Sequence, residues 1–191
     1  MVVSNVRRLW KPWLLAVLVG CAPAAAASAG GSSVPASAHP ADVEFIRGML
    51  HHHEQALEMT SLVADRTTSE QIRLLAQRID ISQQDEIAMM QRWLESKGVP
   101  VESEHTHAGS MPGMLTPEQM QALAAASGEE FDRLFLESMI LHHQGALEMV
   151  ATLFGTPGAA EEADIYQIAS HVDSDQRVEI ARMSRMLNEL R

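Results

Sequence analysis

The chain has 191 residues, of which 46% are hydrophobic and 4% aromatic, and its net charge at neutral pH is −11. This acidity argues against binding to nucleic acid or to anionic lipid, and it is compatible with the capture of cations. Cys21 is the single cysteine, which excludes a disulfide within the chain and leaves the rest of the sequence without a thiolate ligand.

Residues 1–20 have the pattern of an export signal. Three basic residues precede a short apolar stretch that is too brief to cross a bilayer as a helix. The stretch ends in Leu-Val-Gly-Cys, which resembles a bacterial lipoprotein signal with Cys21 as the acylated residue. The alternative is ordinary cleavage in the alanine run at residues 24–27, which would remove Cys21. We therefore expect an exported protein of the bacterial envelope or periplasm, in contact with membrane only through a lipid on Cys21.

The next segment, residues 21–38, consists almost entirely of alanine, serine, glycine and proline. Such a composition cannot bury a core and predicts a flexible tether. Residues 39–191 then have the length of one domain. Loss of residues 1–20 would remove three positive charges and change the net charge from −11 to −14.

The first predicted helix covers about residues 42–64. Its apolar stripe recurs at alternating intervals of four and three residues, which is the seam by which one helix packs on another. The stripe consists of Phe45, Met49, His52, Ala56, Met59 and Val63. His53 lies beside this seam on the same wide apolar face. Two imidazoles, the commonest metal ligands in proteins, therefore stand in the middle of an apolar pattern.

The second predicted helix begins near Thr68 or Ser69, with Thr68 and Gln71 at the spacing of a capping box, and it ends near residue 97. Its inward positions are apolar except for Gln83 and Glu86 near the middle. These positions are Ile72, Leu75, Ile79, Gln83, Glu86, Met90 and Trp93.

A long crossover, residues 98–127, joins the two halves of the chain. It contains four soft or borderline metal ligands within ten residues, namely His105, His107, Met111 and Met114. This cluster is either a copper-capture site at the surface or an ordinary solvated loop. A short helix should follow at Thr116-Pro-Glu-Gln119, which has the residues of a capping box with proline at the first helical position.

The second half repeats the first. Met-x-x-His-His-x-x-Ala-Leu-Glu-Met at residues 49–59 returns at 139–149, and Gln-x-x-Glu at 83–86 returns at 176–179. Antiparallel helices joined by short loops place their middles side by side. We therefore predict an all-α antiparallel four-helix bundle, built from helical hairpins at about 42–97 and 128–190, with one buried polar layer.

This layer should contain His52, His53, His142 and His143 together with Glu86 and Glu179. Met49 and Met139 precede the histidine pairs by three and four residues and share a face with them. Imidazole and thioether together suit copper, Cu(I) especially. The alternative is a structural layer in which each histidine bonds a facing glutamate or glutamine and fixes the helix register. The two alternatives are compatible, because a carboxylate commonly bonds a metal-ligating histidine.

The paired Met-x-x-His-His motif, the paired Gln-x-x-Glu-Ile-Ala-x-Met motif and Met-Pro-Gly-Met-Leu-Thr-Pro-Glu-Gln resemble the domain-of-unknown-function 305 family over about residues 39–191. The resemblance implies a ferritin-like four-helix bundle. Its better-understood members, of the CopM type, are exported copper-binding proteins linked to copper tolerance. The resemblance thus implies a copper-binding protein that is not an enzyme.

Two other functions stay open on the sequence. Ferritin-like bundles often hold two irons through glutamates and a Glu-x-x-His spacing, which this chain lacks, so a di-iron redox protein is an alternative on fold alone. A purely structural envelope lipoprotein is the other. The pattern leaves the oligomeric state open, a homo-oligomer included.

Overall fold

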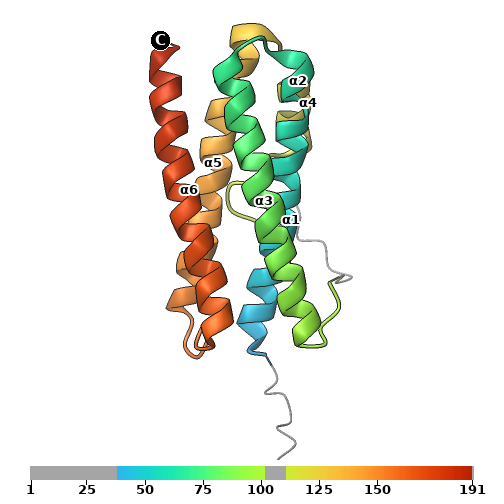
Figure 1. Ribbon diagram of the computed structural model, residues 1–191, viewed down its shortest axis with the longest axis vertical. Coiled ribbons are helices and arrows are strands. Elements are labelled where there is room, and N and C mark those ends of the chain that lie inside the picture. The colour runs from blue at the N-terminus through green and yellow to red at the C-terminus, as the bar shows by residue number, and fades with distance from the viewer. Residues whose placement is uncertain (1–37, 102–110, 191) are drawn as a thin grey trace, which may run out of the picture. The chain divides into compact units, whose positions relative to one another are not determined.

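The computed structural model describes residues 38–101 and 111–190 (Figure 1). The signal segment, the tether, His105 and His107 lie outside the described residues. The elements in chain order are α1 (Pro40–Ser61), α2 (Val63–Arg66), α3 (Glu70–Ser96), α4 (Pro117–Ala125), α5 (Gly128–Gly155) and α6 (Ala163–Glu189). None of these helices has the combination of length and apolar character needed to span a membrane.

The four long helices form a bundle. α1 packs against α3 and α5, and α6 packs against the same two helices on the opposite corner. Each of these neighbouring pairs is antiparallel, so α3 and α5 run in the same direction (Figure 1). The connection between α3 and α5 must therefore return along the length of the bundle. A single long crossover of this kind occurs in ferritin-like folds, and the predicted four-helix bundle is confirmed.

Local capping residues set where the helices begin. The His39 side chain accepts a hydrogen bond from the Ala41 amide (3.2 Å), with proline at the first position of α1. The capping box of α4 is present as predicted, with Thr116 and Gln119 each bonding the other's amide. The predicted box at Thr68 is wrong, because Ser69 accepts from the Ile72 amide and takes the capping position one residue later.

The first predicted helix also ends earlier than expected. The Leu62 amide bonds the Met59 carbonyl, three residues back rather than four, and this tighter turn separates α1 from the one-turn α2. The second half follows the sequence pattern more closely. α5 begins at residue 128, where the second hairpin is predicted to start, and α6 ends at residue 189, one residue before the predicted end.

The buried apolar side chains divide into two separate clusters. One lies toward the end of the bundle that holds α2 and α4, and its large members include Leu75, Ile79, Phe131, Phe135 and Met183. The other lies toward the α5–α6 loop, and its large members include Phe45, Ile46, Trp93, Leu94 and Ile165. The residues between the clusters are polar, so a layer of hydrogen-bonding groups crosses the bundle at mid-height.

Candidate metal centre

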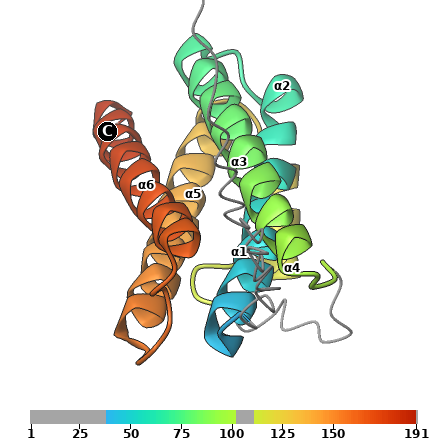
Figure 2. The ribbon, with the colours of Figure 1, turned by 60° about the horizontal axis from the view of Figure 1, so that its bottom comes forward.

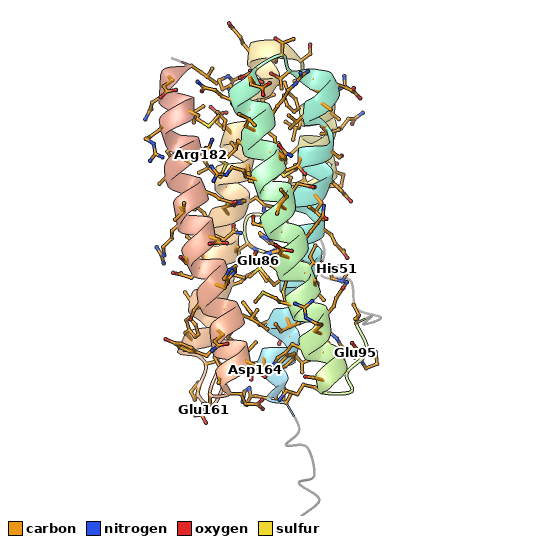
Figure 3. All side chains as sticks on the ribbon, in the orientation of Figure 1. His51, Glu86, Glu95, Glu161, Asp164 and Arg182 are labelled. Atoms are coloured by element: carbon orange, nitrogen blue, oxygen red, sulfur yellow. The ribbon has the colours of Figure 1, made fainter. Side chains whose placement is uncertain are left out.

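The polar layer takes its side chains from all four long helices. α1 contributes His52 and His53, and α5 contributes His142 and His143, all at most 1% exposed. α3 contributes Glu86, which Figure 3 labels at mid-height of the bundle, and α6 contributes Glu179. The predicted burial of the four histidines beside these two carboxylates is confirmed by the contacts described next.

Two equivalent histidine–glutamate pairs form the flanks of the layer. His53 Nε2 donates to Glu86 Oε2 (2.5 Å), and His143 Nε2 donates to Glu179 Oε2 (2.6 Å). These contacts follow the internal repeat. The remaining carboxylate oxygens do not, because Glu179 Oε1 accepts from the Ser82 hydroxyl (3.1 Å), whereas Glu86 Oε1 accepts from the His171 ring (3.1 Å).

The other two histidines meet at the centre of the layer. The ring centroids of His52 and His142 lie 3.8 Å apart, with the planes inclined by 38°. His52 Nε2 lies 3.0 Å from the Pro112 carbonyl oxygen, and a carbonyl can only accept, so Nε2 carries the proton. His52 Nδ1 therefore has a free lone pair. His142 has no hydrogen-bond partner at either ring nitrogen within the described residues.

All four imidazoles are thus left with an unpartnered, buried Nδ1 in the described part of the chain. Burial, followed by the neighbouring His53, lowers the pKa of His52 to about 3. Burial, followed by His52, holds the pKa of His142 well below its usual value. Both rings are therefore neutral near pH 7. A neutral imidazole with a free lone pair is the form that binds metal ions, so the donor chemistry of the layer fits a metal.

The donor atoms of the layer are of a suitable chemical type, but they are not gathered around one point. Among the described histidine, cysteine, aspartate and glutamate side chains, the group of three with donor atoms within 4.8 Å of one another is Glu86, His171 and Asp175. The four layer histidines do not form such a group. Met49 and Met139 are fully buried, but they belong to different apolar clusters. The layer therefore consists of two hydrogen-bonded pairs and two adjacent, tilted rings, and its ligands would have to reorient around an ion.

A second set of donors lines an open groove of about 910 Å³ beside α1 and α5. Its walls include His51, Met111 and Met149. Both methionines lie against Gly48, since a Cβ at that glycine would be 3.5 Å from Met111 Sδ and 3.2 Å from Met149 Cε. Met149 is the repeat counterpart of the seam residue Met59, but its side chain is only partly buried. Met114, the other described methionine of the predicted loop cluster, does not line this groove.

Residues 111–115 of the crossover, which we call the strap, lie over the seam between α1 and α5 (Figure 2). Gln55 holds one end, because its amide oxygen accepts from Leu115 N (2.8 Å) and its amide nitrogen donates to Leu115 O (3.0 Å). Gly145, which replaces Gln55 in the second repeat, allows the other end to approach. A Cβ at position 145 would lie 1.9 Å from Pro112 O.

The profile of the family described as Domain of unknown function (DUF305) matches residues 42–187. The chain belongs to the DUF305 family. The matched region contains all four long helices nearly in full, together with both histidine pairs, the strap and most of the groove.

Solved DUF305 structures share this fold. A DUF305 fragment from Deinococcus radiodurans is 30% identical with a TM-score of 0.73, covering 81% of this chain and 99% of that one. A Streptomyces coelicolor protein named "putative secreted protein DUF305" is 33% identical with a TM-score of 0.70, covering 78% and 93%. CopM in its Cu(II)-bound form is 28% identical with a TM-score of 0.64, covering 78% and 97%. CopM structures also exist in Cu(I)-bound and Ag-bound forms.

A curated relative adds little about function. An uncharacterised protein of Acanthamoeba polyphaga mimivirus is 38% identical over 56 residues, which is 29% of this chain. The match spans only 37% of the length of that relative. The family assignment and the fold therefore rest on the DUF305 profile and on the solved structures.

Several residues of this DUF305 chain escaped the sequence analysis. The sequence analysis assigned no role to His171, which lies at the surface and bonds the buried Glu86. His51, Gln55 and Gly145 were not connected with the crossover. These residues share one signal in the sequence, because each stands where the two repeats differ. For example, His171 replaces Arg78 and Gly145 replaces Gln55. A glycine within a helical pattern often marks a close approach of another backbone.

Proposed function

We propose that this DUF305 protein is an exported, non-enzymatic copper-binding protein that uses imidazole and thioether ligands. One observation carries the proposal: four buried imidazoles lie in one layer of the core, and no Nδ1 among them has a hydrogen-bond partner within the described residues. A buried polar atom without a partner destabilises a fold by about 1–3 kcal/mol. Coordination of an ion would offset that cost. The copper-bound structures of CopM support the choice of metal.

The groove provides the ligands that an arriving copper ion would meet first. Met111, Met149 and His51 offer two thioethers and one imidazole, a soft set that suits Cu(I). The strap separates this groove from His52, since Met111 lines the groove while the adjacent Pro112 carbonyl accepts from His52. Copper held in the groove would therefore be one peptide segment away from the buried imidazoles. The acidic chain, with its net charge of −11, attracts cations without selecting among them.

Copper retention against a Cu(I) chelator tests the proposal. The purified protein is loaded with Cu(I), dialysed against the chelator and analysed for bound copper, alongside loading with Cu(II), Zn²⁺ and Fe²⁺. Changing Met111 and Met149 together to Leu removes two sulfurs and keeps the apolar bulk. Changing His52 and His142 together to Gln removes two of the buried donors. Met120→Leu is the matched control, because Met120 packs on an apolar cluster and lies outside the groove.

We expect both double variants to lose copper and Met120→Leu to retain it. Loss with one double variant alone would assign the copper to the groove or to the layer. Equal retention in all variants would contradict the proposal and leave the structural role of the layer. Retention of two irons with consumption of oxygen would favour the di-iron alternative, although Glu86 and Glu179 each bond a different histidine.

Export and anchoring belong to the same proposal. The signal-like residues 1–20 and the Streptomyces relative named as secreted support an exported protein. Cys21→Ser should move the protein from the membrane fraction to the soluble envelope fraction if Cys21 carries a lipid. Unchanged fractionation would instead favour cleavage within residues 24–27.

A further inference from the structure

A separate cluster of ligands lies at the surface where α3 meets α6. Glu86 reaches it from α3, and His171 and Asp175 come from α6, one helical turn apart on a single face. The three donor atoms lie within 4.8 Å of one another. Glu86 is 1% exposed, whereas the side chains of His171 and Asp175 are 49% and 38% exposed. The cluster therefore has a buried floor and an open outer side.

The spacing of these atoms matches that of ligands around a small divalent cation. His171 Nδ1 lies 3.1 Å from Glu86 Oε1 and 3.8 Å from Asp175 Oδ2. Tetrahedral coordination with bonds of about 2.0–2.1 Å places neighbouring ligand atoms roughly 3.3 Å apart. The two observed distances lie on either side of this value. The exposed side of the cluster, formed by His171 and Asp175, leaves room for a water molecule as a fourth ligand.

The charge of the cluster also favours a cation. It contains two carboxylates and one imidazole, and no lysine or arginine forms an ion pair with either carboxylate in the described part of the chain. A cation bound between Glu86 and Asp175 would offset the repulsion between these two carboxylates.

The internal repeat provides a comparison within the same molecule. At the corresponding corner of the other half, Arg78 stands in place of His171 and Ser82 in place of Asp175. There the Ser82 hydroxyl donates a hydrogen bond to Oε1 of Glu179, the oxygen that does not bond His143. Both corners pack equivalent helices around equivalent histidine–glutamate pairs. The fold therefore does not require a histidine and an aspartate at this position, and the ligand set is a property of one corner alone.

We propose that Glu86, His171 and Asp175 form a surface site for a borderline divalent cation such as Zn²⁺. One imidazole and two carboxylates with an open fourth position suit Zn²⁺ and do not suit Cu(I), which prefers sulfur. The site is separate from the sulfur-lined groove on the α1 and α5 side. Glu86 would bind the cation with one oxygen and keep its bond to His53 with the other.

Titration of the full-length protein with Zn²⁺ by calorimetry, and with Co²⁺ by visible absorption, tests this site. The informative variant combines His171→Arg with Asp175→Ser, which gives this corner the residues of its repeat partner and so preserves the packing. Asp173→Asn is the matched control, since Asp173 is a carboxylate of α6 that pairs with Arg177 outside the cluster. Met111→Leu with Met149→Leu serves as a second control for the copper groove.

We expect the wild-type protein to bind Zn²⁺ and to give the absorption bands of four-coordinate Co²⁺. The double variant should weaken Zn²⁺ binding at least tenfold and lose the bands, while Asp173→Asn and the methionine variant keep both. Copper retention should be unchanged by the double variant, so the copper and zinc proposals can fail separately. Absence of Zn²⁺ binding by the wild type, Zn²⁺ affinity within threefold in the double variant, or an equal loss in Asp173→Asn would overturn the inference.

Discussion

The four layer histidines differ in the group that faces Nε2 of the ring. His53 and His143 each face a carboxylate, which can stabilise a positive ring. His52 faces a backbone carbonyl, and His142 faces no acceptor within hydrogen-bonding distance in the described residues. A neutral acceptor compensates little of the cost of burying a charge. His52 and His142 are therefore the two rings that the fold holds in the neutral form.

The depressed pKa of His52 predicts how stability depends on pH. Its pKa is about 3 in the folded protein and about 6.5 when unfolded, so the unfolded chain binds more protons between these values. Stability is therefore full above about pH 6.5 and falls as the pH decreases, by about 1.4 kcal/mol per pH unit from His52 alone. Burial of His142 acts in the same direction. Urea unfolding of the metal-free protein between pH 7 and pH 4 measures the slope.

The variant His52→Gln provides the control for this slope. It removes one titrating ring, so the dependence on pH should become shallower by the contribution of His52. An unchanged slope, or a ¹⁵N chemical shift that shows His52 protonating near pH 6, would contradict the assignment.

At the scale of the elements, the strap makes a direct backbone contact with α5. It depends on the missing side chain at Gly145, over which Pro112 and Gly113 pass directly. Gly113 also adopts a left-handed conformation, with φ of 74°, and its own Cβ would lie 2.6 Å from the Leu141 carbonyl. Glycine at both positions is therefore needed to seat the strap and to bring the Pro112 carbonyl to His52.

Gly145→Ala should displace the strap. The new methyl group would collide with backbone rather than with a flexible side chain, and such overpacking typically costs about 1–3 kcal/mol. The control is Gly155→Ala at the end of the same helix, where a Cβ meets nothing within 4 Å and should be neutral or slightly stabilising. Chemical denaturation of both variants measures the difference. A Gly145→Ala protein as stable as the control, with an unchanged ¹⁵N shift for His52, would show that the strap adjusts freely.

Helix positions could be predicted from the sequence because they depend on periodicity. The inward positions of the second helix, from Ile72 to Trp93, are all buried, and the apolar stripe of the first helix faces the core. The His-His pairs and the Gln-x-x-Glu motifs lie at the same height of the bundle because neighbouring helices are antiparallel and of similar length. Periodicity says nothing about side-chain rotation, however, and so it could not show that the rings of His52 and His142 lie against each other while His53 and His143 bond glutamates.

The site residues outside the helical seams could not be predicted in the same way. The path of the strap depends on a tertiary fit between Gly145, Gln55 and the strap backbone, to which no local pattern corresponds. Likewise, the partner of His171 is on another helix, 85 residues earlier in the chain. Comparison of the repeats does mark both places, because sequence symmetry is lost where the surroundings of the two halves differ.

At the scale of the whole molecule, the polar layer divides the core into two apolar clusters. A buried ion pair or polar pair rarely adds stability relative to well-packed apolar residues, but the loss of one partner is strongly destabilising. The layer is thus better explained by ligand binding or by helix register than by stability. Each apolar cluster is smaller than the single core that the same four helices could otherwise form.

A double-mutant cycle on His53 and Glu86 tests this division. Glu86→Leu alone leaves both ring nitrogens of the buried His53 without a partner in the described residues, and it should lower the free energy of unfolding by about 3–5 kcal/mol. His53→Leu alone should also be destabilising. The combined variant joins the clusters with apolar bulk and should be within about 1 kcal/mol of the wild type or more stable. Guanidinium unfolding measures all three.

The matched cycle on His143 and Glu179 should show a smaller cost for the single carboxylate change. The Glu179 side chain is 13% exposed, so water can replace part of its interaction, whereas Glu86 is 1% exposed. Costs that simply add in both cycles would show that these pairs do not act as units.

The strap also determines which side of the bundle can open. α1 and α5 are bridged by a backbone segment fixed at Gln55 and seated at Gly145, so these helices cannot move apart until the strap detaches. Across the described part of the opposite side, α3 and α6 are bridged by side chains such as Ser82 and His171, whose bonds break one at a time. Breathing motions should therefore favour the α3–α6 side. Amide hydrogen exchange along α3 and α6 should accordingly be faster than along the strapped faces of α1 and α5.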